Sequence, residues 1–439
     1  MNKKVTLLFT AILMLTLTSC ASVNINSGVL DEEIIENPET NIHYVSSNIE
    51  DQGSARIIGD LAKEYIETHP LTTYNPENVQ VPDLQRKIQL LGASNDLPTM
   101  FSYESGTALE DLIDSGLVLN IEDTFRDLGI YDELKPATVE LLKSIVDDKG
   151  LYTLPLEINV EGFWYNKQMF TQYGLKEPKT WDEMLEAAKI FKRNGIQPFS
   201  LAGKEKWPIT RLINGYVIRK YGYDVMKRVN KGELAVTSSG FIEAASIVQD
   251  MSLKGYFGAT PNSVSADASV DLFLQGRAAM MYTGSWQLRD FNDPQRNKIG
   301  EDNIGLFNIP LVQNGVGTLA DWPLNAGLTT SFAASTYNES VGDWMKYVFS
   351  RYGDKAMNDL GIIPGFKVHN MPEDIPPLTS LAMKRIDEAK QGALWFEAYF
   401  DAKAQSTAWN NAQRLIFDSS YTPLMYMEEL QEVLDKQMN

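Results

Sequence analysis

The stretch Asp271-Leu-Phe-Leu-Gln-Gly-Arg-Ala-Ala-Met-Met-Tyr-Thr-Gly-Ser-Trp286 contains three changes of local structure. A helical turn is predicted to end at Gly276, because glycine accepts the left-handed backbone of a helix C-terminus. The apolar run 278–282 is short enough for a buried strand. Ser285 is then predicted to cap a new helix, which leaves Trp286 at the carboxyl end of the strand, where open α/β sheets bind ligands. The alternative is that Trp286 fills the core, as most tryptophans are substantially buried.

Strand and helix patterns alternate through the N-terminal part of the chain. Residues 41–48 predict a strand and residues 57–66 an amphipathic helix; a turn region around Pro76 and Pro82, a helix over 83–93 and a strand over 99–103 follow. This alternation predicts an α/β fold with a mainly parallel sheet and helices on both faces. The length of 439 residues exceeds the ~250–300 at which single cores stop growing, so two lobes are expected.

The N-terminus has the layout of a signal peptide. Lys3 and Lys4 precede an apolar run, residues 5–17, that is too short to span a bilayer. The following Leu17-Thr-Ser-Cys20 resembles the lipobox of bacterial lipoproteins, in which the cysteine receives a diacylglyceryl group after cleavage. Cys20 is the only cysteine, so it can form neither an intramolecular disulfide nor a cysteine-based metal site. We expect a signal peptide (residues 1–19), lipid on Cys20 and a polar tether (residues 20–40); the alternative is an ordinary secretory signal with an incidental cysteine.

Charge and motifs exclude several functional classes. A net charge of −19, spread along the chain, would repel nucleic acid and anionic membrane surfaces. The three histidines, His43, His69 and His369, have no metal-ligand spacing, and there is no G-x-S-x-G elbow, Walker A motif or G-x-G-x-x-G. We therefore expect no metal, no cofactor and no catalysis, although a glycosidase carboxylate pair is left open because it depends on distances.

Aromatic and short polar residues gather at the predicted ends of strands and helices. Such pairs suit a sugar, which has an apolar C–H face and a rim of hydroxyls that bind carboxylates and amides. The segment 151–167 is expected to cross between the lobes and to place Glu157, Asn159 and Glu161 near the cleft, and Glu157 and Asn159 join this set. The candidate ligand-binding residues are Ser47, Asn48, Tyr103, Glu104, Glu157, Asn159, Trp207, Trp286, Asp321, Trp322, Trp395 and Glu397. Trp181, in the predicted capping box Thr180-Trp-Asp-Glu183, and Trp344 are instead expected to pack in the core.

The chain resembles the family 1 extracellular solute-binding proteins of bacterial ABC importers, especially lipoproteins of the raffinose and multiple-sugar type and, more distantly, maltose-binding protein. Residues 272–286 are similar to the family block F-x-x-G-K-A-A-M-x-x-x-G-x-W, and Gly162-Phe-Trp-Tyr-Asn-Lys167 and Pro178-Lys-Thr-Trp-Asp-Glu183 add to the match. The resemblance implies two α/β lobes that close on a ligand by hinge rotation. It also implies that Trp286 stacks on a sugar ring and that the segment 395–397 lines the cleft.

Two departures put the identity of the ligand in doubt. Ala398 stands where some relatives have a polar side chain, and Asp321-Trp-Pro323 replaces a Gly/Ser-rich form at the expected second crossing. The lobes are expected to comprise residues 41–157 with 322–363, and 158–321 with 364–439.

Together these features predict a monomeric receptor, anchored by lipid on the outer side of the cell membrane or in the periplasm. It would bind an oligosaccharide and deliver it to an ABC permease. The alternatives are an exported glycoside hydrolase and a receptor for a non-sugar solute.

Overall fold

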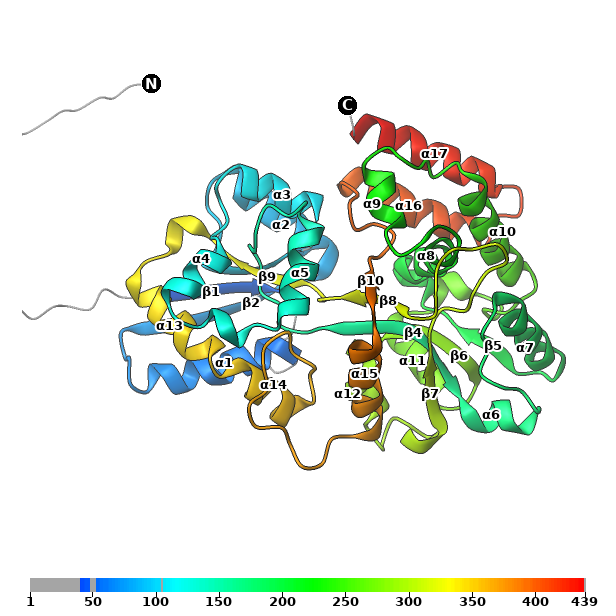
Figure 1. Cartoon of the computed structure of the whole chain (residues 1–439), viewed down its shortest axis with the longest axis horizontal. Coiled ribbons are helices and arrows are strands. Elements are labelled where there is room, and N and C mark those ends of the chain that lie inside the picture. Colours follow the sequence, from blue (N-terminus) through cyan, green and yellow to red (C-terminus); the bar gives the residue numbers. More distant parts are fainter. Residues whose placement is uncertain (1–39, 48–52, 104–105, 438–439) are drawn as a thin grey trace, which may run out of the picture. The chain divides into compact units, whose positions relative to one another are not determined.

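Two β-sheets organise the chain, and helices cover both faces of each (Figure 1). The structure, a computed structural model, describes residues 40–47, 53–103 and 106–437, so the predicted signal peptide, Cys20 and the tether up to residue 39, as well as Asn48 and Glu104, lie outside the described residues. Thr40, predicted as the end of the tether, is the first residue of a strand. The smaller sheet has the strand order β2-β1-β3-β9; the larger has the order β10-β8-β4-β6-β5, with β7 also paired to β4. The mixed α/β fold is therefore confirmed.

The elements have the following bounds. The strands are β1 (Thr40–Ser46), β2 (Thr72–Asn78), β3 (Met100–Tyr103), β4 (Asn159–Asn166), β5 (Gln197–Ser200), β6 (Ala278–Gly284), β7 (Ile304–Phe307), β8 (Asp321–Asn325), β9 (Thr329–Phe332) and β10 (Gln391–Ala393). The helices are α1 (Gly53–Ile66), α2 (Val81–Ala93), α3 (Thr107–Asp114), α4 (Ile121–Asp127), α5 (Pro136–Ile145), α6 (Lys167–Gln172), α7 (Trp181–Arg193), α8 (Trp207–Tyr221), α9 (Val225–Asn230), α10 (Ser239–Leu253), α11 (Ala266–Leu274), α12 (Leu288–Phe291), α13 (Glu339–Phe349), α14 (Tyr352–Leu360), α15 (Pro377–Glu388), α16 (Ala402–Leu415) and α17 (Pro423–Gln437).

The smaller sheet is mainly parallel, as the strand–helix alternation predicts. β1 pairs in parallel with β2 and β3, and only β9 runs antiparallel, against β3. Side chains alternate across β1: Ile42 and Tyr44 join one core with α1 and α13, whereas Val45 joins the core on the other face with α2 and α3. Trp344 of α13 is fully buried in the first of these cores, which confirms the prediction that it packs there.

The larger sheet is mixed, and β4 lies at its centre. β4 pairs antiparallel with β6, β7 and β8, while β5–β6 and β8–β10 are parallel pairs. The neighbours Phe163 and Trp164 point to opposite faces, Phe163 into the core with α7, α8, α10, α16 and α17, and Trp164 into the core with α11, α12 and α15. This double coverage explains the uninterrupted apolar run in β6, which is buried along its whole length.

Residues 72–78 correct one sequence prediction. They form strand β2, although Pro76 and Pro82 indicate a turn region. Pro76 lies opposite Tyr44 of β1, and β2 is the edge strand of its sheet. An edge strand tolerates proline because one side of its backbone has no partner strand, so the missing N–H breaks no ladder bond there.

The chain changes sheet between β8 and β9, later than the predicted boundary at residue 322. β8 belongs to the larger sheet and β9 to the smaller, so only residues 326–328 separate them. β4, whose first residue Asn159 pairs with Asn325 at the end of β8, lies beside the same crossing. The segment that leads into β4 and residues 326–328 therefore cross between the sheets side by side, and they are the two crossing segments.

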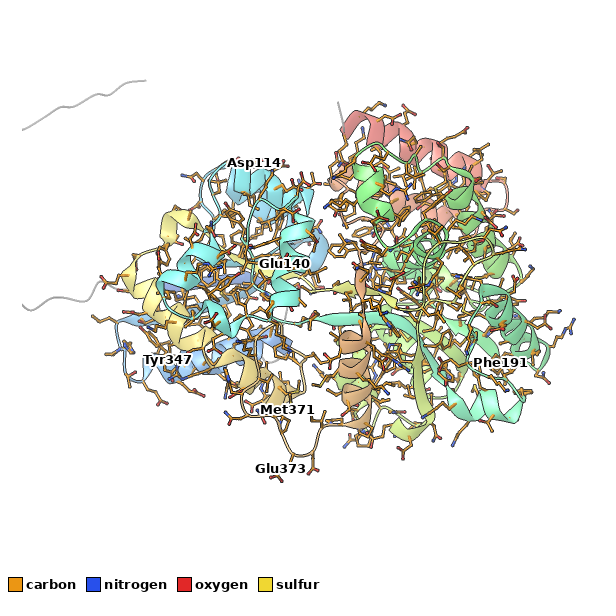
Figure 2. The ribbon with its side chains drawn as sticks, viewed as in Figure 1. Asp114, Glu140, Phe191, Tyr347, Met371 and Glu373 are labelled. Atoms are coloured by element: carbon orange, nitrogen blue, oxygen red, sulfur yellow. The ribbon has the colours of Figure 1, made fainter. Side chains whose placement is uncertain are left out.

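Acidic side chains account for the charge of the surface. Asp114 of α3, Glu140 of α5 and Glu373, in the segment before α15, are all exposed (Figure 2). Phe191 of α7, in contrast, is fully buried among apolar side chains. The negative charge is thus distributed over the surface rather than collected in a tail.

The predicted capping box at the start of α7 is present. Thr180 Oγ1 accepts a hydrogen bond from the Glu183 backbone N–H (3.2 Å), and the Glu183 carboxylate accepts from the Thr180 N–H (3.3 Å). Trp181, next to the cap, is 3% exposed and packs against Phe163, as expected for a core residue.

Replacing Thr180 by alanine is expected to lower the free energy of unfolding by about 1 kcal/mol, because one helical N–H loses its acceptor. Thr180→Ser retains the oxygen and should remain near the wild-type stability. Urea denaturation followed by far-UV circular dichroism measures both variants, and equal losses for the two would contradict a capping role.

Candidate functional site

A cavity of about 400 Å³ lies beside the two crossing segments. Its volume falls in the range of small-molecule sites. Asn325 of the larger sheet and residues next to strands of both sheets, such as Ser47 and Leu328, contribute, and four tryptophans give it an aromatic wall. The lining residues are Ser47, Ser54, Leu156, Glu157, Trp207, Arg211, Trp286, Asn325, Gly327, Leu328, Trp395, Glu397, Gln405 and Trp409.

Trp286 and Trp207 form one corner of the aromatic wall. Trp286 follows β6 in the short 3-10 helix η4 (Ser285–Gln287), and Trp207 is the first residue of α8. Their ring centroids lie 5.8 Å apart in an edge-to-face arrangement. A Cβ atom at position 284 would collide with the Trp286 ring, so Gly284 allows this ring to fold back over the end of the strand.

Ser285 fixes this corner to β4, in a role different from the one predicted. It does not cap a helix: η4 begins after Gly284 without a side-chain cap. The Ser285 Oγ–H instead donates to Asn159 Oδ1 (2.9 Å), and Oγ accepts from the Val160 N–H (3.3 Å). The end of β6 is thereby tied to the first residues of β4, which explains why a small hydroxyl residue suits position 285.

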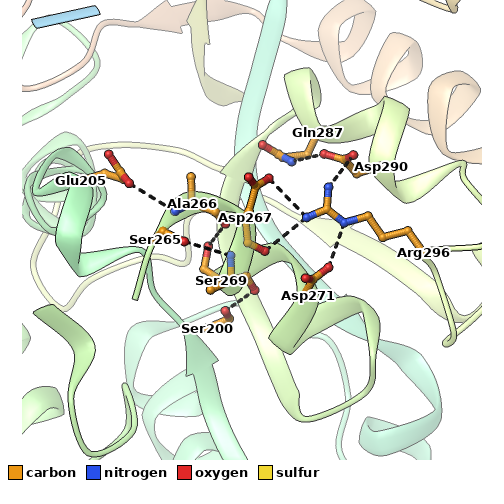
Figure 3. A network of polar contacts seen from close by, with 11 residues as sticks. Ser200, Glu205, Ser265, Ala266, Asp267, Ser269, Asp271, Gln287, Asp290 and Arg296 are labelled. Carbon is orange, nitrogen blue, oxygen red and sulfur yellow. Dashed lines mark hydrogen bonds and ion pairs between the residues drawn. The ribbon is translucent and has the colours of Figure 1, made fainter. Parts of the chain in front are cut away.

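Arg296 joins the helices on either side of β6 and η4 (Figure 3). Its guanidinium contacts Asp271 (2.9 Å) and Asp267 (3.4 Å) of α11 and Asp290 (2.7 Å) of α12. Burial lowers the pKa of Arg296, but the hydrogen bond to Asp271 and the attraction of Asp290 outweigh it, so the pKa is raised. This cluster restrains the helix that follows Trp286.

Arg211 is the cation of the cavity. It lies one helical turn after Trp207 on α8 and donates from Nε to Glu161 (3.2 Å) and from Nη1 to Glu397 (2.9 Å). Its side chain is 13% exposed, and those of Glu161 and Glu397 are 2% and 1% exposed. Burial lowers the pKa of Arg211, but the attraction of both glutamates outweighs it and raises the pKa. The guanidinium also lies 5.5 Å from the Trp207 ring and 5.9 Å from the Trp395 ring, within cation–π range.

The two glutamates that hold Arg211 make further hydrogen bonds. Glu397 Oε1 accepts from the Trp409 indole N–H (3.0 Å) and from the Thr210 hydroxyl. Glu161 Oε1 accepts from Asn325 Nδ2 (2.6 Å) at the end of β8, and Asn325 Oδ1 accepts from the Gly327 N–H (2.9 Å). A continuous set of polar contacts therefore runs from the aromatic wall to the crossing segment 326–328.

Glu157 is the junction with a second, more polar cavity of about 580 Å³. Both cavities are lined by Ser54, Glu157 and Trp286, and the second also by Asn159. Burial raises the pKa of the Glu157 carboxyl, and a hydrogen bond with Asn159 offsets this in part. The two cavities therefore adjoin at Glu157.

The structure brings together half of the candidate residues. Ser47, Glu157, Trp207, Trp286, Trp395 and Glu397 line the first cavity. Asn159 lines the second cavity only. Tyr103 is 1% exposed and reaches only a much smaller hollow, which it shares with Glu397 and Gln405. Asn48 and Glu104 are among the residues that the structure does not describe.

Asp321 and Trp322 lie elsewhere, because β8 begins at Asp321 and reaches the cavity only at its other end. The Asp321 carboxylate accepts from the Thr318 N–H (2.8 Å) and hydroxyl (3.0 Å). Trp322 is 4% exposed and lines a separate hollow beside Arg385. These contacts are structural, and Asn325 takes the place at the crossing that the sequence predicts for Asp321.

Several cavity residues escape the sequence analysis. Arg211 could have been found, because a residue four positions after Trp207 lies on the same helix face. Asn325 and Gly327 follow an apolar strand in the typical order of a strand end and turn. Gln405 and Trp409 lie on α16, eight and twelve residues after Glu397, and no local pattern marks them. Only the tertiary fold brings them in.

The described residues contain no group of three His, Cys, Asp or Glu side chains that could hold a metal ion. In the same part of the chain, no helix is both long enough and apolar enough to cross a membrane.

Known proteins resemble this chain in sequence and in fold. The multiple sugar-binding protein of Streptococcus mutans is 26% identical over 385 residues, which cover 82% of this chain and 84% of that protein. An uncharacterised ABC transporter extracellular-binding protein of Pyrococcus horikoshii is 24% identical over 209 residues, so the match spans about half of each (46% and 46%). Among solved structures, a chitin oligosaccharide binding protein superposes with a TM-score of 0.81 at 23% identity, over 91% of this chain and 99% of that one.

The family profile described as bacterial extracellular solute-binding protein matches residues 52–353. These residues include β4, β6 with Trp286, and both crossing segments beside the cavity. The match exceeds half of the chain, and the chain therefore belongs to the bacterial extracellular solute-binding protein family.

Proposed function

We propose that this protein is a receptor that captures an oligosaccharide in the tryptophan-lined cavity and delivers it to an ABC permease. The observation that carries the proposal is the meeting of Trp207, Trp286, Trp395 and Trp409 around one space that polar side chains also line. Aromatic faces complement the C–H face of a pyranose, and Ser47, Glu157 and Gln405 offer partners for hydroxyls. The names of the multiple sugar-binding and chitin oligosaccharide binding relatives agree with this ligand class.

The size of the site supports an oligosaccharide rather than a single sugar. The first cavity, of about 400 Å³, adjoins the second, of about 580 Å³, at Glu157. The second cavity adds charged and amide groups, including Asn159, Asp290 and Arg289. A chain of sugars would place one ring on the aromatic wall and extend into the polar space.

The protein would bind its ligand without converting it. Both oxygens of Glu397 are engaged, Oε1 by Trp409 and Thr210 and Oε2 by Arg211. A general acid of a glycoside hydrolase has to give a proton to the leaving oxygen, and a carboxylate held by a guanidinium is poorly suited to that step. Ligand capture followed by release to a permease needs only differential binding between conformations.

The location follows from the N-terminal sequence. Cleavage before Cys20 and lipid on its thiol would hold the protein, as a monomer, at the outer side of the cell membrane or in the periplasm. The permease would then recognise the ligand-bound form. Incorporation of radiolabelled palmitate into wild-type protein, and its loss in Cys20→Ser, tests the anchor.

Isothermal titration calorimetry with raffinose, stachyose, maltotriose, cellotriose, β-1,4-galactotriose and N,N′,N″-triacetylchitotriose tests the ligand class. We expect saturable binding of at least one sugar at micromolar concentration, with no shorter sugar in the mixture after overnight incubation. Binding of oligopeptides with no response to any of these sugars would overturn the proposed ligand class, and release of shorter sugars would favour the hydrolase alternative.

A further inference from the structure

We propose that the receptor selects oligosaccharides that are uncharged where they occupy the tryptophan-lined cavity, and that Glu157 is the residue that rejects acidic sugars. This inference rests on the proposed function, because it specifies the ligand of that same site. The receptor would distinguish neutral oligosaccharides from those built of uronic acids, which have the same ring and linkage but carry a carboxylate in place of each primary alcohol.

The first observation is the balance of charge around the cavity. The cavity is lined by one guanidinium, that of Arg211, and by the carboxylates of Glu157 and Glu397, and a third acid, Glu161, also pairs with Arg211. Arg211 already faces two carboxylates, at 3.2 Å and 2.9 Å, and its remaining environment includes the Trp207 and Trp395 rings. The charge of this one cation is therefore already balanced by two acids of the protein.

The second observation is the isolation of Glu157. Within residues 40–47, 53–103 and 106–437, no Lys, Arg or His forms an ion pair with this carboxylate; its neighbours include the Asn159 amide, the buried Tyr352 and the left-handed turn at Gly327. Burial raises the Glu157 pKa, which shows that its charge is poorly solvated. A second carboxylate placed beside the ionised Glu157 side chain, in a space of low dielectric, would be repelled.

The inference applies only to the first, tryptophan-lined cavity, because arginines line the second cavity. Arg56 and Arg289 are exposed on that side, and Arg296 is held by Asp267, Asp271 and Asp290. An acidic group at one end of a ligand could reach Arg289. The test therefore uses a ligand oxidised at every primary alcohol, so that in every binding register the tryptophan-lined cavity holds a charged ring or a ring joined directly to a charged one.

The probe is the tightest-binding sugar of the six above, all of which carry primary alcohols. It is compared with its derivative in which every primary alcohol is oxidised to a carboxylate, and with the methyl ester of that derivative. The ester keeps the added atoms and removes the charge. Binding is measured by calorimetry at about pH 8, well above the ordinary pKa of a glutamate, with the wild type, Glu157→Gln, Glu157→Asp and Glu233→Gln. Glu233 is exposed and lines neither cavity, so Glu233→Gln is a matched change of net charge.

We expect the wild type to bind the acid about 100-fold more weakly than the ester. Glu157→Gln should lower the ratio of the Kd for the acid to the Kd for the ester at least about 10-fold, while Glu157→Asp and Glu233→Gln should leave this ratio unchanged. The inference is overturned if the wild type binds the acid as well as the ester. It is also overturned if Glu157→Gln leaves the ratio of the two affinities unchanged, or if the acid and the ester are both rejected because of their size. The wild-type ratio alone decides the selectivity if Glu157→Gln does not fold. Failure of all six sugars to bind would instead contradict the proposed function.

Discussion

Replacing Arg211 by methionine is expected to lower the free energy of unfolding by about 3–5 kcal/mol. Methionine retains most of the stem but removes the cation, so Glu161 and Glu397 would remain buried beside each other without a positive partner. Removing one member of a buried ion-pair network is costly for this reason, even where the whole network adds little stability. Guanidinium denaturation followed by circular dichroism measures the change.

The companion variants make this test specific. Lys436→Met removes an exposed i,i+4 pair with Glu432, whose side chains are 62% and 72% exposed, and should change stability by less than about 0.5 kcal/mol. The triple variant Arg211→Met, Glu161→Gln, Glu397→Gln removes the charges together and should be more stable than Arg211→Met alone. A loss below about 1 kcal/mol for Arg211→Met would mean that water reaches the two glutamates and that the network is not buried in solution.

The parts of the fold that the sequence predicts are those determined by local pattern. The alternation of β1, α1, α2 and β3 is visible because each element has its own period and its own breaker residues. β2 is not predicted, because proline at position 76 is compatible with both a turn and an edge strand. Only the pairing with β1 decides between these two structures. The same holds for Ser285, whose hydroxyl suits either a helix cap or the contact with Asn159.

The residues of the site are likewise predicted where a general rule applies and missed where only the tertiary fold decides. Trp286 and Ser47 are predicted because strand ends converge at one edge of a sheet, which is a rule of topology. Asp321 and Trp322 are misplaced because the rule needs the direction of β8, and the sequence does not show which end of that strand faces the cavity. Glu161 and Arg211 form their pair across fifty residues, so no local spacing could reveal that the cation of the site is neutralised by the protein itself.

Replacing Trp286 by alanine is expected to weaken sugar binding about 30-fold, equivalent to about 2 kcal/mol, which is typical of a central tryptophan in a binding site. The side chain is only partly buried and lines both cavities, so its loss removes contact with the ligand more than it removes core packing. The melting temperature without ligand should therefore stay within a few degrees of the wild type.

Two further variants separate stacking from simple loss of volume. Trp286→Phe keeps an aromatic face and should recover most of the affinity, whereas Trp286→Leu keeps apolar bulk and should not, because a leucine offers no flat surface to a pyranose ring. Trp344→Phe is the matched control: Trp344 is fully buried in the core beside β9, so this change should reduce stability and leave affinity unchanged. If Trp286→Ala binds sugar as tightly as the wild type, the ligand does not contact this ring, and the aromatic wall would have to be assigned to Trp207, Trp395 and Trp409 alone.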